Sequence, residues 1–285
     1  MTTPAPTAAT TSPTPAVEPP TRFRDLLAAE WIKTRSLRST PWTIALTVLT
    51  VIGAAAVSAL TLYDDLPEPV AGARHAAVFI PSSAYPPGGY WTLILIAAGA
   101  GALTVVSEYG SGLIRTTTVA VPARGSVVLA KAVVVAGLWT AVGVTVSTGS
   151  FLVSQAILDG RDAGVPLSHP GVYRALAASA LLAPVCALVG LGLGVLLRHA
   201  AATMTTSALV LLMLPPVFSE GTRWTAVVNH AMPVSAWRRL VQPWEPDPDS
   251  LLAHTATVPG SWAVYLLWPL VAVALAVLVI RHRDV

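Results

Sequence analysis

Charged residues that could make specific polar contacts concentrate in residues 107–131. There Glu108 is followed by a Gly-Ser-Gly stretch, then by Arg115, and a short apolar run ends at Pro122 and Arg124. Glycine permits a bend and proline ends a helix, so the pattern predicts a small helix or turn, parallel to the membrane surface if the flanking apolar runs cross a bilayer. Such an element could transmit movement between two proteins. The alternative is that Glu108 and Arg115 form only a local ion pair.

Residue patterns for hydrolysis within a membrane do not occur in this sequence. They would be a His/Glu zinc pattern, a Gly-x-Gly-Asp with a second Asp, or a Ser/His pair at membrane depth. The histidines fall in predicted loops, tails or a tight turn, and the single cysteine, Cys186, lies inside an apolar run, where packing is its expected role. We therefore expect no catalytic residues and no metal site. A membrane-embedded enzyme or a sensory or structural membrane protein remains the alternative function.

A phosphate-binding loop of the form Gly-x-x-x-x-Gly-Lys-Ser/Thr is also absent from the sequence, whose only lysines are Lys33 and Lys131. The chain is therefore expected to hold no cofactor of its own. If ATP drives its activity, another protein must bind the ATP and its magnesium ion.

Six apolar runs dominate the chain, with 54% hydrophobic and 11% charged residues overall. A soluble chain carries about 25% charged residues. A helix of about 20 apolar residues crosses the roughly 30 Å hydrocarbon core of a bilayer. The sequence thus predicts an all-α, polytopic membrane protein with six transmembrane helices, at about residues 43–62, 90–106, 132–152, 173–197, 200–218 and 262–280.

The basic residues next to these runs predict the orientation. With the N-terminus inside, 11 Lys and Arg residues fall on the inner side and 6 on the outer side, which places both termini in the cytoplasm. Positions beside the spans also suit contact with anionic lipid headgroups rather than nucleic acid. The excess of Arg over Lys, with abundant Ala, Pro and Gly, favours a GC-rich bacterium and its cytoplasmic membrane.

The N-terminal region divides into two parts. Residues 1–20 are rich in Pro, Ala and Thr and are expected to be a disordered tail. The pattern of residues 21–41 predicts an amphipathic helix that lies in the headgroup region of the membrane and is ended by Pro41. Its Glu30 lies in the middle of the apolar face, so this carboxylate must be paired, turned to water or in contact with a partner. The helix also carries the interfacial residues Trp31, Lys33 and Arg35.

These two regions resemble the membrane (permease) subunits of type-2 ATP-binding-cassette exporters, particularly six-span actinobacterial members. The resemblance rests on the stretch 29–35 and on Glu108, Tyr109, Gly112, Ile114, Arg115, Thr116, Pro122, Arg124, Ala130 and Lys131. Matching residues are frequent in the first half of the chain, whereas the second half resembles the family only in the arrangement of its spans. One departure is Gly110, where such permeases usually carry a basic residue.

The resemblance implies that the loop between spans two and three couples the permease to a separate cytoplasmic ATPase, which binds ATP and magnesium. In this interpretation Glu108 and Arg115 make polar contacts, Gly112 provides the bend, and Pro122 and Arg124 return the chain to the third span. A second permease copy or homologue completes a dimer. The exported substrate stays open.

Two further segments carry expectations of their own. Residues 219–261, rich in Trp and Pro, predict short re-entrant or interfacial helices on the outer side, with Arg238 and Arg239 as a surface charge pair. The GxxxG spacing of Gly190 and Gly194 predicts close helix packing, either within one subunit or between two.

Overall fold

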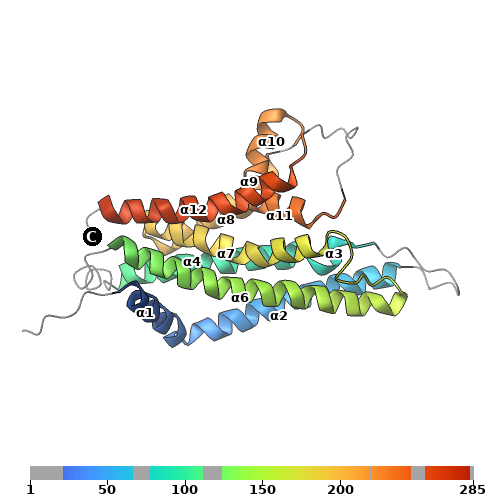
Figure 1. The fold of residues 1–285 in the computed structure, drawn as a ribbon, viewed down its shortest axis with the longest axis horizontal. Helices are drawn as coiled ribbons and strands as arrows, with labels where there is room; N and C mark the ends of the chain where they lie inside the picture. The colour runs from blue at the N-terminus through green and yellow to red at the C-terminus, as the bar shows by residue number, and fades with distance from the viewer. Residues whose placement is uncertain (1–21, 67–77, 112–123, 219, 245–253, 283–285) are drawn as a thin grey trace, which may run out of the picture.

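A computed structural model describes residues 22–66, 78–111, 124–218, 220–244 and 254–282, and these form helices and connections without a strand. Figure 1 shows the helices in an elongated bundle. In chain order they are α1 (Phe23–Ser36), α2 (Ser39–Asp65), α3 (Pro81–Ala84), α4 (Pro87–Gly110), α6 (Arg124–Leu158), α7 (Val172–Leu197), α8 (Ala200–Ala208), α9 (Leu214–Val217), α10 (Arg223–His230), α11 (Pro233–Val241) and α12 (Val258–His282). A 3₁₀ turn, Asp159–Arg161, follows α6, and a π-helical turn, Leu209–Met213, joins α8 to α9.

Six helical segments of the described chain are long and apolar enough to cross a membrane: α2, α4, α6, α7, the α8–α9 segment and α12. The all-α class with six membrane-spanning helices is therefore confirmed. Most of the helices extend past the predicted apolar runs. The largest extension is in α6, whose 35 residues span about 52 Å at 1.5 Å per residue. The apolar runs marked the part suited to hydrocarbon, while the backbone stays helical into the polar flanks.

The junction between α1 and α2 differs from the prediction. Pro41 does not end the first helix, because α1 already ends at Ser36 and Pro41 lies in the first turn of α2. Proline is tolerated there, since the first N–H groups of a helix have no intrahelical partner. The side-chain hydroxyl of Thr40 donates to the carbonyl of Thr34 at 3.0 Å and fastens the turn.

The turn between the fourth and fifth spans is as tight as the sequence predicted. Arg198 adopts the left-handed conformation, with φ of 55°, directly after α7. His199 then caps α8, its Nδ1 accepting a hydrogen bond from the Ala202 N–H at 3.3 Å.

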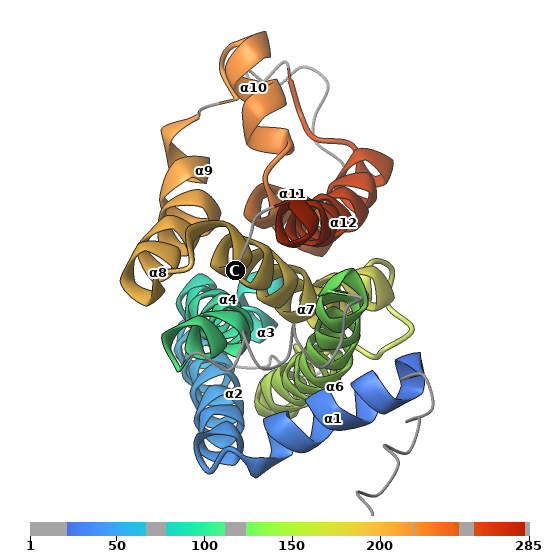
Figure 2. The same ribbon diagram turned by 90° about the vertical axis from the view of Figure 1, so that its left-hand side faces the viewer.

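Helix α7 is the central element, in contact with α4, α6, α11 and α12. Figure 2, a view along the bundle, shows α4 and α6 on one side of α7 and α11 and α12 on the other. Small residues bring α4 and α7 together: a Cβ added to Gly190 would lie 1.9 Å from the Ala98 carbonyl oxygen, and one added to Gly101 would lie 1.9 Å from that of Ala187. Gly190 and Gly194 thus face α4 inside the chain, which settles this pair as an internal packing motif.

Two short helices, α10 and α11, follow the fifth span. Helix α11 is largely buried, and its Trp237 ring stacks on Tyr90 with 4.9 Å between centroids and donates from Nε1 to the Ser179 hydroxyl at 3.1 Å. The expected surface pair is wrong for Arg239, which is buried and donates from Nε to the Ala256 carbonyl at 2.8 Å, whereas Arg238 is exposed. Successive residues of a helix point in different directions, so neighbours in sequence need not share an environment.

Helix α1 and the C-terminal end of α12 lie at the same end of the bundle (Figure 1). We call this the α1 end. The C-terminal end of α4 and the start of α6 also lie there, joined to α1 by side-chain contacts.

Candidate functional site

Four charged side chains from three helices form a closed ring of ion pairs at the α1 end. The Lys131 ammonium of α6 lies 2.6 Å from Glu30 Oε2 of α1 and 2.9 Å from Glu108 Oε1 of α4. The Lys33 ammonium of α1 lies 2.7 Å from Glu30 Oε1 and 3.0 Å from Glu108 Oε1. Each lysine therefore bridges both glutamates. We call Glu30, Lys33, Glu108 and Lys131 the ion-pair ring.

The ring is mostly withdrawn from solvent. The side chains of Glu30 and Lys131 are each 6% exposed and that of Glu108 is 12% exposed, whereas Lys33 is 45% exposed. Two carboxylates and two ammoniums give a formal charge of zero. Buried charges are tolerated when they are paired and hydrogen-bonded, and removing one member leaves another uncompensated.

Lys33 is the solvent-facing member of the ring. Its partial burial disfavours the ammonium, but the hydrogen bonds that Lys33 donates to Glu30 and Glu108, and the attraction of both carboxylates, outweigh this and raise the pKa of Lys33 above its usual 10.5. Lys33 is therefore fully charged at neutral pH.

Local structure explains why these residues meet. Glu30 sits on the face of α1 that is turned to the bundle, one turn from the partly buried Leu27 and Thr34. Glu108 lies in the last turn of α4, where the helix dipole disfavours a negative charge, so cations must compensate it. Lys131 lies two turns into α6 and reaches both acids.

The contact between Glu108 and Lys131 has a topological consequence. These residues stand before and after the segment 112–123, yet their side chains are 2.9 Å apart. The C-terminal end of α4 and the first turns of α6 are therefore held side by side, and α1 is attached to both through Glu30 and Lys33.

A second polar contact lies beside the ring. The Arg198 guanidinium packs over the Tyr109 ring, 4.9 Å from its centroid, an attractive cation–π geometry. Nε and Nη2 of Arg198 are buried and meet no hydrogen-bond acceptor in the part of the chain that the structure describes. Tyr109 directly follows Glu108, so the turn after α7 also touches the end of α4.

The structure places the predicted site residues in three groups. Glu30, Lys33 and Glu108 belong to the ring, and Glu30 is thus paired within the chain. Trp31 and Arg35 are exposed on α1, and Arg124 begins α6 half-buried. The remaining three, Gly112, Arg115 and Pro122, lie outside the described residues.

Sequence reasoning did not assign Lys131 to the site, although the residue closes the ring. The available signal was its rarity, since Lys33 and Lys131 are the only lysines of the chain. Glu30 stands without an evident partner on an apolar face, and Lys131 stands at the start of an apolar run. A search for opposite charges in apolar surroundings could have paired the two residues.

Comparison with known proteins gave no relative: no family model and no curated protein matches the chain. Within the described residues, no three His, Cys, Asp or Glu side chains are grouped so that they could hold a metal ion. The site consequently has to be interpreted from its own geometry.

Proposed function

We propose that this chain is the membrane subunit of an ATP-driven exporter of the type-2 ATP-binding-cassette class. It forms the transport path together with a second permease copy and is driven by a separate cytoplasmic ATPase. In this proposal the α1 end faces the cytoplasm of a bacterial cell, and the loop between α4 and α6 contacts the ATPase.

The observation that supports this proposal best is the ion-pair ring. A loop that receives force from another protein must transmit it to the spans. A flexible loop would change its own conformation instead of moving the spans. Here the Glu108–Lys131 pair joins the end of α4 to the first turns of α6, the helices on either side of the loop, and Glu30 and Lys33 attach α1 to this pair. A displacement of the loop would therefore move α1, α4 and α6 together.

The lysines add a second argument. Nucleotide-binding loops use a lysine to reach the phosphates, but the only two lysines of this chain each contact two glutamates within the ring. This arrangement favours hydrolysis of ATP by a partner. It also makes the lysines part of the mechanical link in our proposal.

The test is to produce the tagged chain with candidate ATPase subunits from its own genome and to purify it in mild detergent. The proposal expects a stoichiometric ATPase whose hydrolysis depends on the complex. Reproducible absence of such a partner would overturn it, and hydrolytic activity of the chain alone in detergent would favour the membrane enzyme instead.

A further inference from the structure

Arg198 stands in the turn between α7 and α8 with a backbone conformation that arginine rarely adopts. Its φ of 55° and ψ of 16° place it in the left-handed region, which costs conformational free energy for most residues other than glycine. Many helices end in this conformation, and glycine is the residue that fits it best. The presence of an arginine here therefore needs an explanation from its side chain.

The side chain of Arg198 holds two donors that have no acceptor. Its guanidinium packs over the Tyr109 ring, and within the described part of the chain its buried Nε and Nη2 donate to nothing. These two nitrogens form the edge of the guanidinium that can donate two parallel hydrogen bonds to one carboxylate. Leaving buried donors unpaired is costly, and more so when the group is charged. The edge is thus suited to a carboxylate that it does not hold in this conformation.

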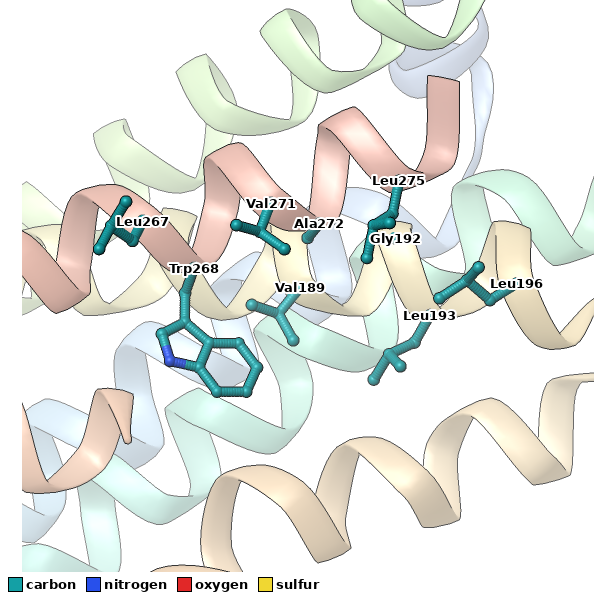
Figure 3. A pocket seen from close by; sticks show the side chains of 9 residues that line it. All are labelled: Val189, Gly192, Leu193, Leu196, Leu267, Trp268, Val271, Ala272 and Leu275. Atoms are coloured by element: carbon teal, nitrogen blue, oxygen red, sulfur yellow. The ribbon is translucent and has the colours of Figure 1, made fainter. Parts of the chain in front are cut away.

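The surroundings of α7 exclude two sources for this acceptor. Figure 3 shows Leu193 and Leu196, in the last turns of α7, among the side chains that line a groove towards α12, and none of the lining side chains carries an oxygen. Solvent and dissolved anions do not reach Nε and Nη2 of Arg198, because both atoms are buried. An acceptor for this edge must therefore come from the protein itself, through a local rearrangement.

Glu108 is the acid with an unused oxygen at the α1 end. The other acids that the structure describes at this end are Asp25, which is engaged in the exposed first turn of α1, and Glu30, which uses one oxygen for each lysine of the ring. In Glu108 both lysines contact Oε1, so that Oε2 meets no donor among the described residues. Glu108 also directly precedes Tyr109, on whose ring Arg198 lies.

We propose that Arg198 is a second, exchangeable partner of Glu108. In the conformation described, Glu108 pairs with Lys33 and Lys131, and Arg198 lies on Tyr109. In a second conformation, a shift of the last turn of α4 against the turn after α7 brings the Glu108 carboxylate onto Nε and Nη2 of Arg198. The exchange involves this chain alone and is independent of an ATPase. Within the proposed function it gives the end of α4 two stable positions.

Charge balance determines when the exchange is favoured. With two glutamates and two lysines the ring is neutral, so Glu108 gains little from a third cation. Lys33 is 45% exposed, and its removal leaves the buried pair of Lys131 and Glu30 in place. The remaining two glutamates and one lysine carry a net negative charge, which pairing of Glu108 with Arg198 would neutralise. Lys33→Met should therefore shift the chain towards the second conformation.

The experiment is a double-mutant cycle between Glu108→Gln and Arg198→Gly, measured by equilibrium unfolding in detergent with and without Lys33→Met. Glycine removes the guanidinium and also relieves the left-handed backbone, so Arg198→Gly keeps the turn. The matched control replaces Arg198→Gly by Arg281→Gln. Arg281 is an exposed cation at the same end, but its guanidinium lies against Gly125 of α6.

With Lys33 present, the effects of Glu108→Gln and Arg198→Gly on the unfolding equilibrium constant should multiply to within about twofold, because the two groups are unpaired. In Lys33→Met, the double variant should be destabilised at least about tenfold less than this product, whereas the Arg281→Gln cycle should stay within about twofold. Multiplicative effects in Lys33→Met would overturn the proposal. Equal deviations in both cycles would overturn it too, because general charge repulsion would then explain them.

A second measurement detects the contact directly. In protein carrying isotope-labelled arginine, the Nε–H magnetic resonance signal that is missing from Arg198→Gly belongs to Arg198. This signal should move downfield in Lys33→Met, as donation to a carboxylate requires, and should return in Lys33→Met/Glu108→Gln. An unchanged signal in Lys33→Met would contradict the proposal. A shift that persists without the Glu108 carboxylate would also contradict it, since a backbone carbonyl would then be the acceptor.

Discussion

The ammonium of Lys131 lies 2.6 Å from the carboxylate of Glu30, although 101 residues separate them and both side chains are almost fully buried. This ion pair joins α1 to α6. Together with Glu108 it attaches the N-terminal helix to the two spans that flank the loop. An N-terminal helix held only by lipid would slide independently of the bundle, but the buried pair fixes it to α6.

Removing Lys131 alone should destabilise the protein. Lys131→Met leaves two glutamates with one lysine, and breaking a buried ion pair costs about 3–5 kcal/mol. The double variant Lys131→Met/Glu30→Gln restores neutrality, with Lys33 and Glu108 still paired, so most of the loss should be recovered. Thermal unfolding in detergent measures both variants. Additive losses would contradict a coupled ring.

The contribution of Lys33 should depend on pH only in the alkaline range. Its pKa in the folded protein is raised above 10.5, so its stabilisation is complete below the unfolded pKa and is lost as the pH rises through the folded value. The stability difference between wild type and Lys33→Met should therefore be constant from about pH 7 to about pH 9. It should decrease only above the usual lysine pKa. A difference that already shrinks between pH 7 and pH 9 would contradict this cause.

Close packing between α4 and α7 predicts a sharp contrast between two glycines. Gly190→Ala places a methyl group 1.9 Å from the Ala98 carbonyl oxygen, whereas a methyl at Gly137 on α6 has no neighbour within 4 Å. Overpacking costs about 1–3 kcal/mol, so Gly190→Ala should unfold at lower temperature. Gly137→Ala should be neutral or stabilising, since alanine favours helices. Equal unfolding temperatures would argue against the tight contact.

Neighbouring arginines of α11 offer another matched pair. Arg239 is 6% exposed and donates to the carbonyl oxygens of Ala256 and Trp244, at 2.8 and 3.4 Å. Hydrogen bonds to charged groups contribute about 1.5–3 kcal/mol, so Arg239→Ala should lower stability by about this amount. Arg238→Ala, on the exposed side, should stay within about 0.5 kcal/mol of wild type. Proteolysis of the 242–257 segment provides a second readout, faster in Arg239→Ala only.

The spans could be predicted from sequence because hydrocarbon imposes a length and an absence of charge that six apolar runs satisfy. The position of the α1–α2 turn could not, since Pro41 is compatible both with a helix end and with a first turn. Glu30 was recognisable as an anomaly on an apolar face. Its partner Lys131 depended on how α1 packs against α6, which helical periodicity does not specify. The environment of Arg239 likewise depended on where the carbonyl groups of Trp244 and Ala256 lie relative to α11.

The ring determines which variants can test coupling at Glu108. Glu108→Lys would bring a third ammonium beside Lys33 and Lys131 and would disturb the fold itself. Glu108→Gln keeps the shape and a hydrogen-bond acceptor while removing the charge. Asp25→Asn is the matched control, an acid-to-amide change at an exposed position of α1.

The most direct test is ATP hydrolysis by a purified complex of this chain with the proposed ATPase partner, compared among wild type, Glu108→Gln and Asp25→Asn at equal subunit stoichiometry. Our account predicts that both variants assemble, that hydrolysis falls about tenfold in Glu108→Gln, equivalent to about 1.4 kcal/mol of coupling, and that Asp25→Asn matches wild type. Wild-type hydrolysis in an assembled Glu108→Gln complex would contradict the role of the ring in coupling.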